Sequence, residues 1–142
     1  MKRELNREDW QYVNTKSPEA FRYYLCGVKA FIKSDFTLAK DLYLNAITID
    51  SNYYDAFYGI YFSYVNQENW EQAKKWCLRF YNKSYHMPMV EKIWINYAHA
   101  FCFETPDDEI KYLNLLKDLD KISGDPYLLA GGAYYRLRQY DK

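Results

Sequence analysis

The chain has 142 residues, and its 19 basic and 19 acidic side chains give a formal net charge of zero. A chain of this length can bury about two thirds of its unfolded surface in one domain. Zero net charge removes any broad electrostatic attraction to nucleic acid or to an anionic membrane, so we expect neither as a partner, although a local patch remains compatible with the composition.

The first ten residues, MKRELNREDW, are charged and lack the apolar core of a secretion signal. No apolar run approaches the roughly 18 residues that a membrane-spanning helix needs. The three cysteines, Cys26, Cys77 and Cys102, lie in apolar helical runs and lack the close Cys/His spacing of a zinc site. We therefore expect a cytoplasmic protein with buried thiols and no metal, in which residues 1–17 form a linker or a short extra segment.

Helix starts are marked by Ser17, Thr105 and Asp125, each of which precedes a proline. The side-chain oxygen at such a position can accept hydrogen bonds from the free amides of the first turn. Apolar residues then recur at spacings of three, four and seven. This pattern predicts an all-α chain of about seven helices at residues 18–33, 37–49, 54–66, 70–83, 90–103, 107–122 and 126–138. The short polar connections favour antiparallel neighbours.

The helices repeat with a period of 34 residues. Phe36 and Trp70 have this separation, each just after a polar turn, and Ala39 and Ala73 have it three residues later. A third copy fits after three residues are inserted around HMPM. The resulting repeats lie at about residues 20–53, 54–87 and 91–123, with a partial fourth at 124–142. Because one helix pair cannot bury its own apolar face, the pairs are expected to stack into an α-solenoid.

Gly27 stands inside the helical stretch YYLCGVKAFIKSDF, where glycine costs about 1 kcal/mol relative to alanine. Ala98 and Gly131 occupy the same place in the third and fourth copies, and Tyr61 occupies it in the second. We expect the small residue to let the first helix of a repeat approach its own second helix. A wider separation is then expected at Tyr61.

This pattern resembles the tetratricopeptide repeat, in which an aromatic, an aliphatic and a small residue mark the first helix, an aromatic the turn, and an alanine the second helix. In the first copy the matching residues are Tyr23, Cys26, Gly27, Phe36, Ala39, Ala46 and Asp50. In the second copy they are Phe57, Ile60, Trp70, Ala73 and Phe80. Tyr61, Phe80 and Ile110 depart from it, which predicts looser or rotated packing. The opening segment TKSPEAFRYYLCGVKAF is similar to repeat arrays attached to bacterial signalling proteins such as kinases and nucleotide cyclases.

The resemblance implies a right-handed superhelix whose first helices line a concave groove for a partner protein or peptide. When the family's groove positions are placed on this sequence by their position within each repeat, they fall on Tyr24, Val28, Tyr58, Phe62, Asn66, Lys92, His99, Tyr135 and Arg136. Phe31, Ile32 and Phe103 also fall at groove positions but are expected to be core between repeats. Tyr24 and Val28 replace the lysine and asparagine with which the family clamps a C-terminal carboxylate. The expected ligand is therefore apolar or aromatic.

Together these features predict a protein-interaction scaffold within a larger bacterial signalling or regulatory protein. A free-standing chaperone of the secretion type is the alternative, because such chaperones carry a similar number of these repeats. We expect no enzyme, catalytic residue or cofactor: His86 and His99 lack metal-pair spacing, and no glycine-rich phosphate loop occurs. The acidic TPDDE motif is expected simply from helix capping. Self-association or fraying is expected at residues 126–140, whose apolar stripe has no following helix to cover it.

Overall fold

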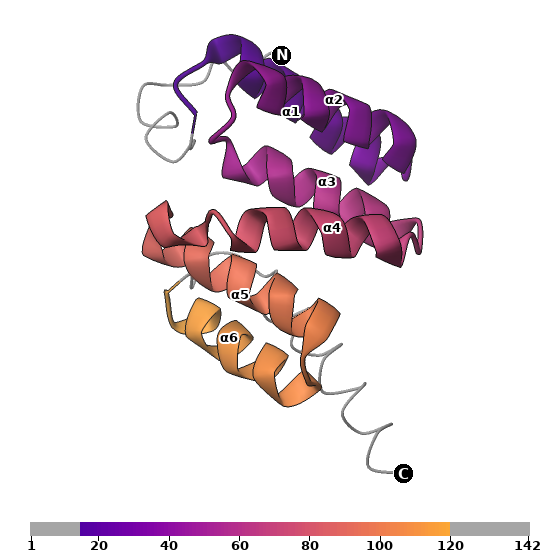
Figure 1. Ribbon diagram of the computed structural model, residues 1–142. Coiled ribbons are helices and arrows are strands. Elements are labelled where there is room, and N and C mark those ends of the chain that lie inside the picture. Colours follow the sequence, from indigo (N-terminus) through magenta and orange to yellow (C-terminus); the bar gives the residue numbers. More distant parts are fainter. Residues whose placement is uncertain (1–14, 120–142) are drawn as a thin grey trace. The chain divides into compact units, whose positions relative to one another are not determined.

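The computed structural model describes residues 15–119, which are all-helical apart from short connections. The elements in chain order are α1 (Pro18–Ile32), α2 (Phe36–Ile49), α3 (Tyr54–Asn66), α4 (Trp70–Tyr81), the short 3-10 helix η2 (Ser84–His86), α5 (Met89–Phe103) and α6 (Pro106–Leu119), as Figure 1 shows. The predicted all-α fold and six of its predicted helices are confirmed, and η2 was not predicted. The seventh predicted helix, the partial fourth repeat and the segment expected to self-associate lie outside the described residues, as does most of the predicted N-terminal segment.

The chain divides into two compact units, with the boundary inside α4 between Trp76 and Cys77. In the first unit α2 packs against both α1 and α3, and α1 also contacts α3. In the second unit α5 packs against α6 (Figure 1). The helix α5 also contacts η2. Within each unit, helices that are neighbours in the chain are therefore neighbours in space, which is the packing of a helical repeat.

The turns after α1 and α3 show the repeat in the backbone itself. Ser34 and Glu68, which are 34 residues apart, have φ values of 61° and 56°, in the left-handed region. Each closes a Schellman turn, whose hydrogen bonds satisfy carbonyl groups at the helix end. The matching bonds run from Ser34 N to Phe31 O (2.9 Å) and Asp35 N to Ala30 O (2.9 Å), then from Glu68 N to Val65 O (3.0 Å) and Asn69 N to Tyr64 O (3.0 Å). The predicted period of the first two copies is confirmed.

The capped helix starts at Ser17 and Thr105 form as the sequence indicates, and the third predicted start, at Asp125, lies outside the described residues. The Ser17 hydroxyl accepts a hydrogen bond from the Ala20 N–H at 3.2 Å. At the start of α6, Thr105 Oγ1 accepts from the Asp108 N–H at 3.4 Å, and Asp108 Oδ2 accepts from the Thr105 N–H at 3.3 Å. This reciprocal pair is a capping box with aspartate in place of the usual glutamate.

The core of the first unit is organised by Tyr43 of α2, which is buried. A Cβ atom built on Gly27 of α1 would lie 2.6 Å from Tyr43 Cε1, and one built on Gly59 of α3 would lie 2.5 Å from Tyr43 Cδ2. The predicted close approach of Gly27 to its own second helix is therefore confirmed, and Gly59 has a matching role that was not predicted. Tyr61 is buried as well, and the wider separation expected there stays a prediction.

Two side chains expected in the core between repeats are exposed. Ile32 is 76% exposed and Phe103 is 43% exposed, so the core prediction was wrong for both. Each is the last residue of its helix, where the chain turns away and no following helical turn remains to cover the side chain. Phe31 is half-buried, and its ring packs at 5.1 Å between centroids against the ring of Phe36.

The cysteines also differ from the expectation of three buried thiols. Cys77 is buried and Cys102 is half-buried, but Cys26 is exposed. Cys26 shares the outer face of α1 with the exposed residues Arg22 and Lys29, four positions before it and three positions after it. The burial prediction was therefore wrong for Cys26, because the helix turns that face toward solvent.

Candidate functional site

The first candidate surface lies on α1 and α3, the first helices of the first two repeats. Its members, all half-buried, are Tyr24 and Val28 on α1 and Asp55, Tyr58 and Phe62 on α3. Their spacings of three, four and seven residues place them along one face of each helix, and the two helices are in contact. We call these five residues the α1–α3 surface.

Tyr24 anchors this surface to the core. Its ring centroid lies 5.2 Å from that of Tyr53 and 5.7 Å from that of Tyr43. Burial raises the pKa of the Tyr24 hydroxyl above its ordinary value, and the nearby Asp55 carboxylate raises this pKa further. The hydroxyl thus stays neutral at physiological pH and keeps its proton available as a hydrogen-bond donor.

Tyr53, just before α3, belongs to the same aromatic group but was not predicted as a site residue. It is fully buried, and its hydroxyl has no hydrogen-bond partner among the described residues. Burial and the carboxylates of Asp55 and Asp50 raise the pKa of Tyr53. No sequence signal marks it, because it lies at a turn that the helical repeat pattern does not include.

Tyr58 and Phe62 form a rigid aromatic pair on α3. Their rings stack with centroids 6.0 Å apart and planes inclined by 26°, and Phe62 also meets the ring of Tyr61 at 5.1 Å. The exposed side chain of Asn66 donates a hydrogen bond from Nδ2 to the Phe62 carbonyl oxygen at 2.8 Å. This bond fixes the amide one turn beyond the aromatic pair, with Oδ1 as its remaining acceptor.

The second candidate surface lies in the second unit around His99 of α5. The His99 ring stacks on Tyr81 at a centroid separation of 4.1 Å and lies 5.0 Å from Phe103. Its Nδ1 atom is 2.7 Å from Oε1 of Glu104. An ionised carboxylate can only accept, so Nδ1 carries a proton, and Nε2 is an acceptor nitrogen whenever the ring is neutral. We call Tyr81, His99, Phe103 and Glu104 the His99 cluster.

The repeat pattern predicted His99 as a site residue but did not predict Tyr81 or Glu104, whose side chains contact the His99 ring. Tyr81 ends α4, a second helix, whereas the groove positions expected from the tetratricopeptide resemblance lie only on first helices. Glu104 follows His99 by five residues, a spacing that does not pair side chains on a helix. The contact forms because α5 ends at Phe103 and the chain then turns. The repeat pattern contains no signal for such a contact.

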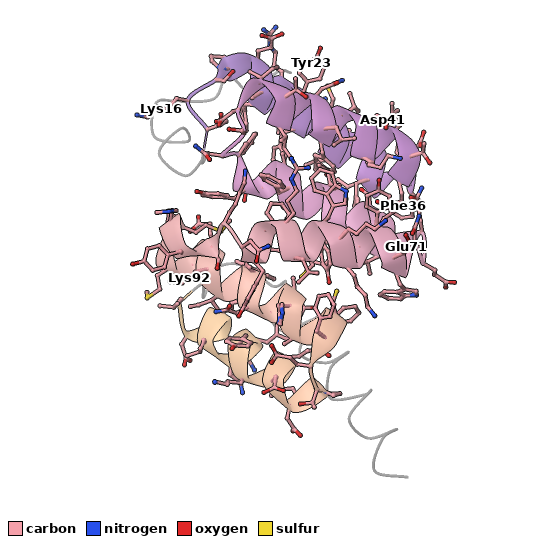
Figure 2. The ribbon with its side chains drawn as sticks, viewed as in Figure 1. Lys16, Tyr23, Phe36, Asp41, Glu71 and Lys92 are labelled. Carbon is pink, nitrogen blue, oxygen red and sulfur yellow. The ribbon has the colours of Figure 1, made fainter. Side chains whose placement is uncertain are left out.

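Lys92 is the other predicted site residue described in the second unit. It is half-buried on α5 (Figure 2), and its Nζ atom lies 5.7 Å from the ring centroid of Tyr85 in a cation–π contact. The structure therefore places Tyr24, Val28, Tyr58, Phe62 and Asn66 in the first unit, and Lys92 and His99 in the second. The predicted residues Tyr135 and Arg136 lie outside the described residues.

Within residues 15–119, no three histidine, cysteine, aspartate or glutamate side chains group in a way that could hold a metal ion. Over the same range, every helix is too short or too polar to cross a membrane. A scan against protein-family models and a search of curated proteins found no match to the chain.

Proposed function

We propose that the chain is a protein-interaction scaffold of the tetratricopeptide-repeat type, within a larger bacterial signalling or regulatory protein, and that it binds a peptide segment of a partner. The observation that supports this most strongly is the stacked pair of Tyr58 and Phe62 on α3. The same helix already buries Phe57 and Ile60 completely. Two rings that stay half-exposed on the other face, in a fixed geometry, provide a surface for a partner.

The chemistry of the α1–α3 surface favours a ligand with apolar or aromatic side chains. Tyrosine and phenylalanine lose few rotamers on contact, so a rigid ring contributes binding free energy at a small entropic penalty. Around the rings lie the Tyr24 hydroxyl, the Asp55 carboxylate and Oδ1 of Asn66, which can pair with polar groups of an extended peptide. The rings would supply affinity, and the polar atoms would orient the peptide.

The His99 cluster offers a similar combination in the second unit. Phe103 exposes apolar ring surface, and the contact of Glu104 with Nδ1 orients the His99 ring, so that Nε2 of the neutral ring is an acceptor. A backbone N–H or a hydroxyl of a bound peptide is a suitable donor to this nitrogen. We propose the two surfaces as separate contact sites, each formed within its own unit.

A selected peptide tests the proposal directly. A random peptide display library is selected on the full chain, and the affinity of the recovered peptides is measured by fluorescence anisotropy. Tyr58→Ala should weaken binding by about tenfold or more at the α1–α3 surface. His99→Ala should have a comparable effect on peptides that bind the second unit.

Tyr112, a half-buried tyrosine of the second helix α6, provides a matched control for the loss of a tyrosine. Tyr112→Ala should change the affinity by less than about twofold. Circular dichroism of each variant separates loss of binding from loss of fold. If Tyr58→Ala and His99→Ala both bind the selected peptides as the original chain does, the first-helix surfaces are not the binding sites and the proposal fails.

A further inference from the structure

Cys77 of α4 and Cys102 of α5 face each other in the second unit. The stack of Tyr81 on His99, with centroids 4.1 Å apart, shows which faces of the two helices meet. Residues three or four positions apart share one helix face. Cys77 lies four positions before Tyr81 and Cys102 three positions after His99, so an antiparallel alignment brings the two thiols opposite each other. The Cys102 side chain also lies near enough to the Cys77 thiol to raise its pKa.

The two thiols differ in access to solvent. Cys77 is 1% exposed, whereas Cys102 is half-buried. The interaction with the Cys102 side chain and the burial of Cys77 raise the pKa of the Cys77 thiol. Since the thiolate is the reactive form, a dissolved oxidant is expected to react first at Cys102, and Cys77 is placed to resolve the product.

We propose that Cys77 and Cys102 are a reversible redox site that a small-molecule disulfide, such as oxidised glutathione, converts to an intramolecular disulfide. This inference is independent of the proposed binding function. Its geometric basis is the placement of the two thiols on facing sides of α4 and α5, next to the stack of Tyr81 on His99, since a disulfide forms only where the side chains already point toward each other.

The reaction balances in two exchange steps. The Cys102 thiolate attacks one sulfur of oxidised glutathione, which forms a mixed disulfide and releases one glutathione thiolate. The Cys77 sulfur, after losing its proton, attacks the Cys102 sulfur of the mixed disulfide and releases the second glutathione. Both protein thiols are oxidised, two molecules of reduced glutathione form, and their sulfurs take up the two protons from the cysteines.

The experiment uses the full chain with Cys26→Ser, because exposed Cys26 could otherwise form disulfides between molecules. The protein is equilibrated with oxidised glutathione, quenched with acid and digested with trypsin without reduction. Mass spectrometry should find the tryptic peptide 76–79 linked to the peptide 93–111, two hydrogen masses below the sum of the reduced peptides. Addition of reduced glutathione should remove the link, and the oxidised protein should melt at a higher temperature than the reduced one.

A second variant tests the assigned order of reaction. With Cys77→Ser added to Cys26→Ser, Cys102 should retain one glutathione as a stable mixed disulfide. Circular dichroism shows whether each variant stays folded during oxidation. The proposal is overturned if folded Cys26→Ser protein keeps both thiols, stops at the mixed disulfide, or forms the 77–102 link only in denaturant.

Discussion

The ring of Tyr43 in α2 lies directly against Gly59 in α3, so that a Cβ atom at position 59 would stand 2.5 Å from Tyr43 Cδ2. Gly27 of α1 meets the other side of the ring, where a Cβ atom would stand 2.6 Å from Cε1. One tyrosine thus packs against glycines of two first helices and joins three helices of the first unit. The helix penalty of each glycine is offset by this packing.

Gly59→Ala is expected to destabilise the first unit although alanine is the better helix former. The added methyl group would overlap a ring that cannot move away, because Gly27 confines its other side. Overpacking should outweigh the helix propensity gain of about 1 kcal/mol and leave a net loss of about 1–2 kcal/mol in the free energy of unfolding. Urea denaturation measures this loss, and Gly27→Ala should behave in the same way.

A Tyr43→Leu background identifies the cause of that loss. Leucine lacks the ring atoms that meet position 59, so Gly59→Ala on this background should be neutral or stabilise the chain. An unchanged penalty in the double variant would show that the ring contact is not responsible.

The stability of the first unit should fall at high pH through Tyr43. Burial raises the pKa of Tyr43 to about 12, whereas the unfolded side chain ionises near its ordinary value of about 10. The folded state holds the hydroxyl proton of Tyr43 more tightly than the unfolded state does. The protonated hydroxyl therefore makes its full contribution to the free energy of unfolding below about pH 10, and this contribution is lost as the pH rises through about 12. The difference of about two between the folded and unfolded pKa values corresponds to about 3 kcal/mol in the free energy of unfolding.

Tyr43→Phe keeps the ring and removes the ionisation, so it should reduce the alkaline loss of stability measured by urea denaturation at a series of pH values. Tyr85→Phe is the control for the loss of a tyrosine hydroxyl that is not buried, because Tyr85 is 82% exposed. Identical profiles for Tyr43→Phe and the original chain would contradict the assignment.

Glycine at the two left-handed turn positions should stabilise the chain. Ser34 and Glu68 have positive φ values, which crowd the Cβ atom of an L-residue and favour glycine. Ser34→Gly and Glu68→Gly should each raise the free energy of unfolding by about 0.5–1 kcal/mol in thermal or urea denaturation. Ser51 is also an exposed turn residue but lacks a positive φ, so Ser51→Gly should not stabilise. Equal effects at all three positions would rule out relief of backbone strain.

The capping box of α6 should be visible in the titration of Asp108. The hydrogen bonds from the Thr105 hydroxyl and backbone N–H lower the pKa of the Asp108 carboxyl. Because the pKa of Asp108 is lower in the folded state, its ionised carboxylate stabilises the folded chain fully at pH values above the unfolded pKa of about 4. This stabilisation is lost as the pH falls through the folded pKa. Carboxyl chemical shifts measured by NMR should report this lowered pKa.

Thr105→Val removes the hydroxyl donor and should bring the pKa of Asp108 closer to its ordinary value. Thr105→Ser retains the hydroxyl and should keep the pKa low. If valine and serine give the same titration curve, the hydroxyl hydrogen bond is not what lowers the pKa.

Much of the candidate surface could be placed from the sequence, but its contacts could not. The register of the repeat put Tyr24, Tyr58 and Phe62 on first-helix faces, where the structure finds them half-buried. Nothing in that register indicated that Tyr81 and Glu104 would hold His99, because one lies on a second helix and the other beyond a helix end.

The sequence by itself determined the helices, their capped starts and the 34-residue period, because these depend on local spacing and on hydrogen bonds between near neighbours. Only the tertiary structure decided which faces meet. The place of Gly59 against Tyr43 and the exposure of Cys26 and Ile32 depend on how each helix is rotated about its own axis and where it ends. That rotation results from side-chain packing between helices, which the apolar pattern of a single helix defines only approximately.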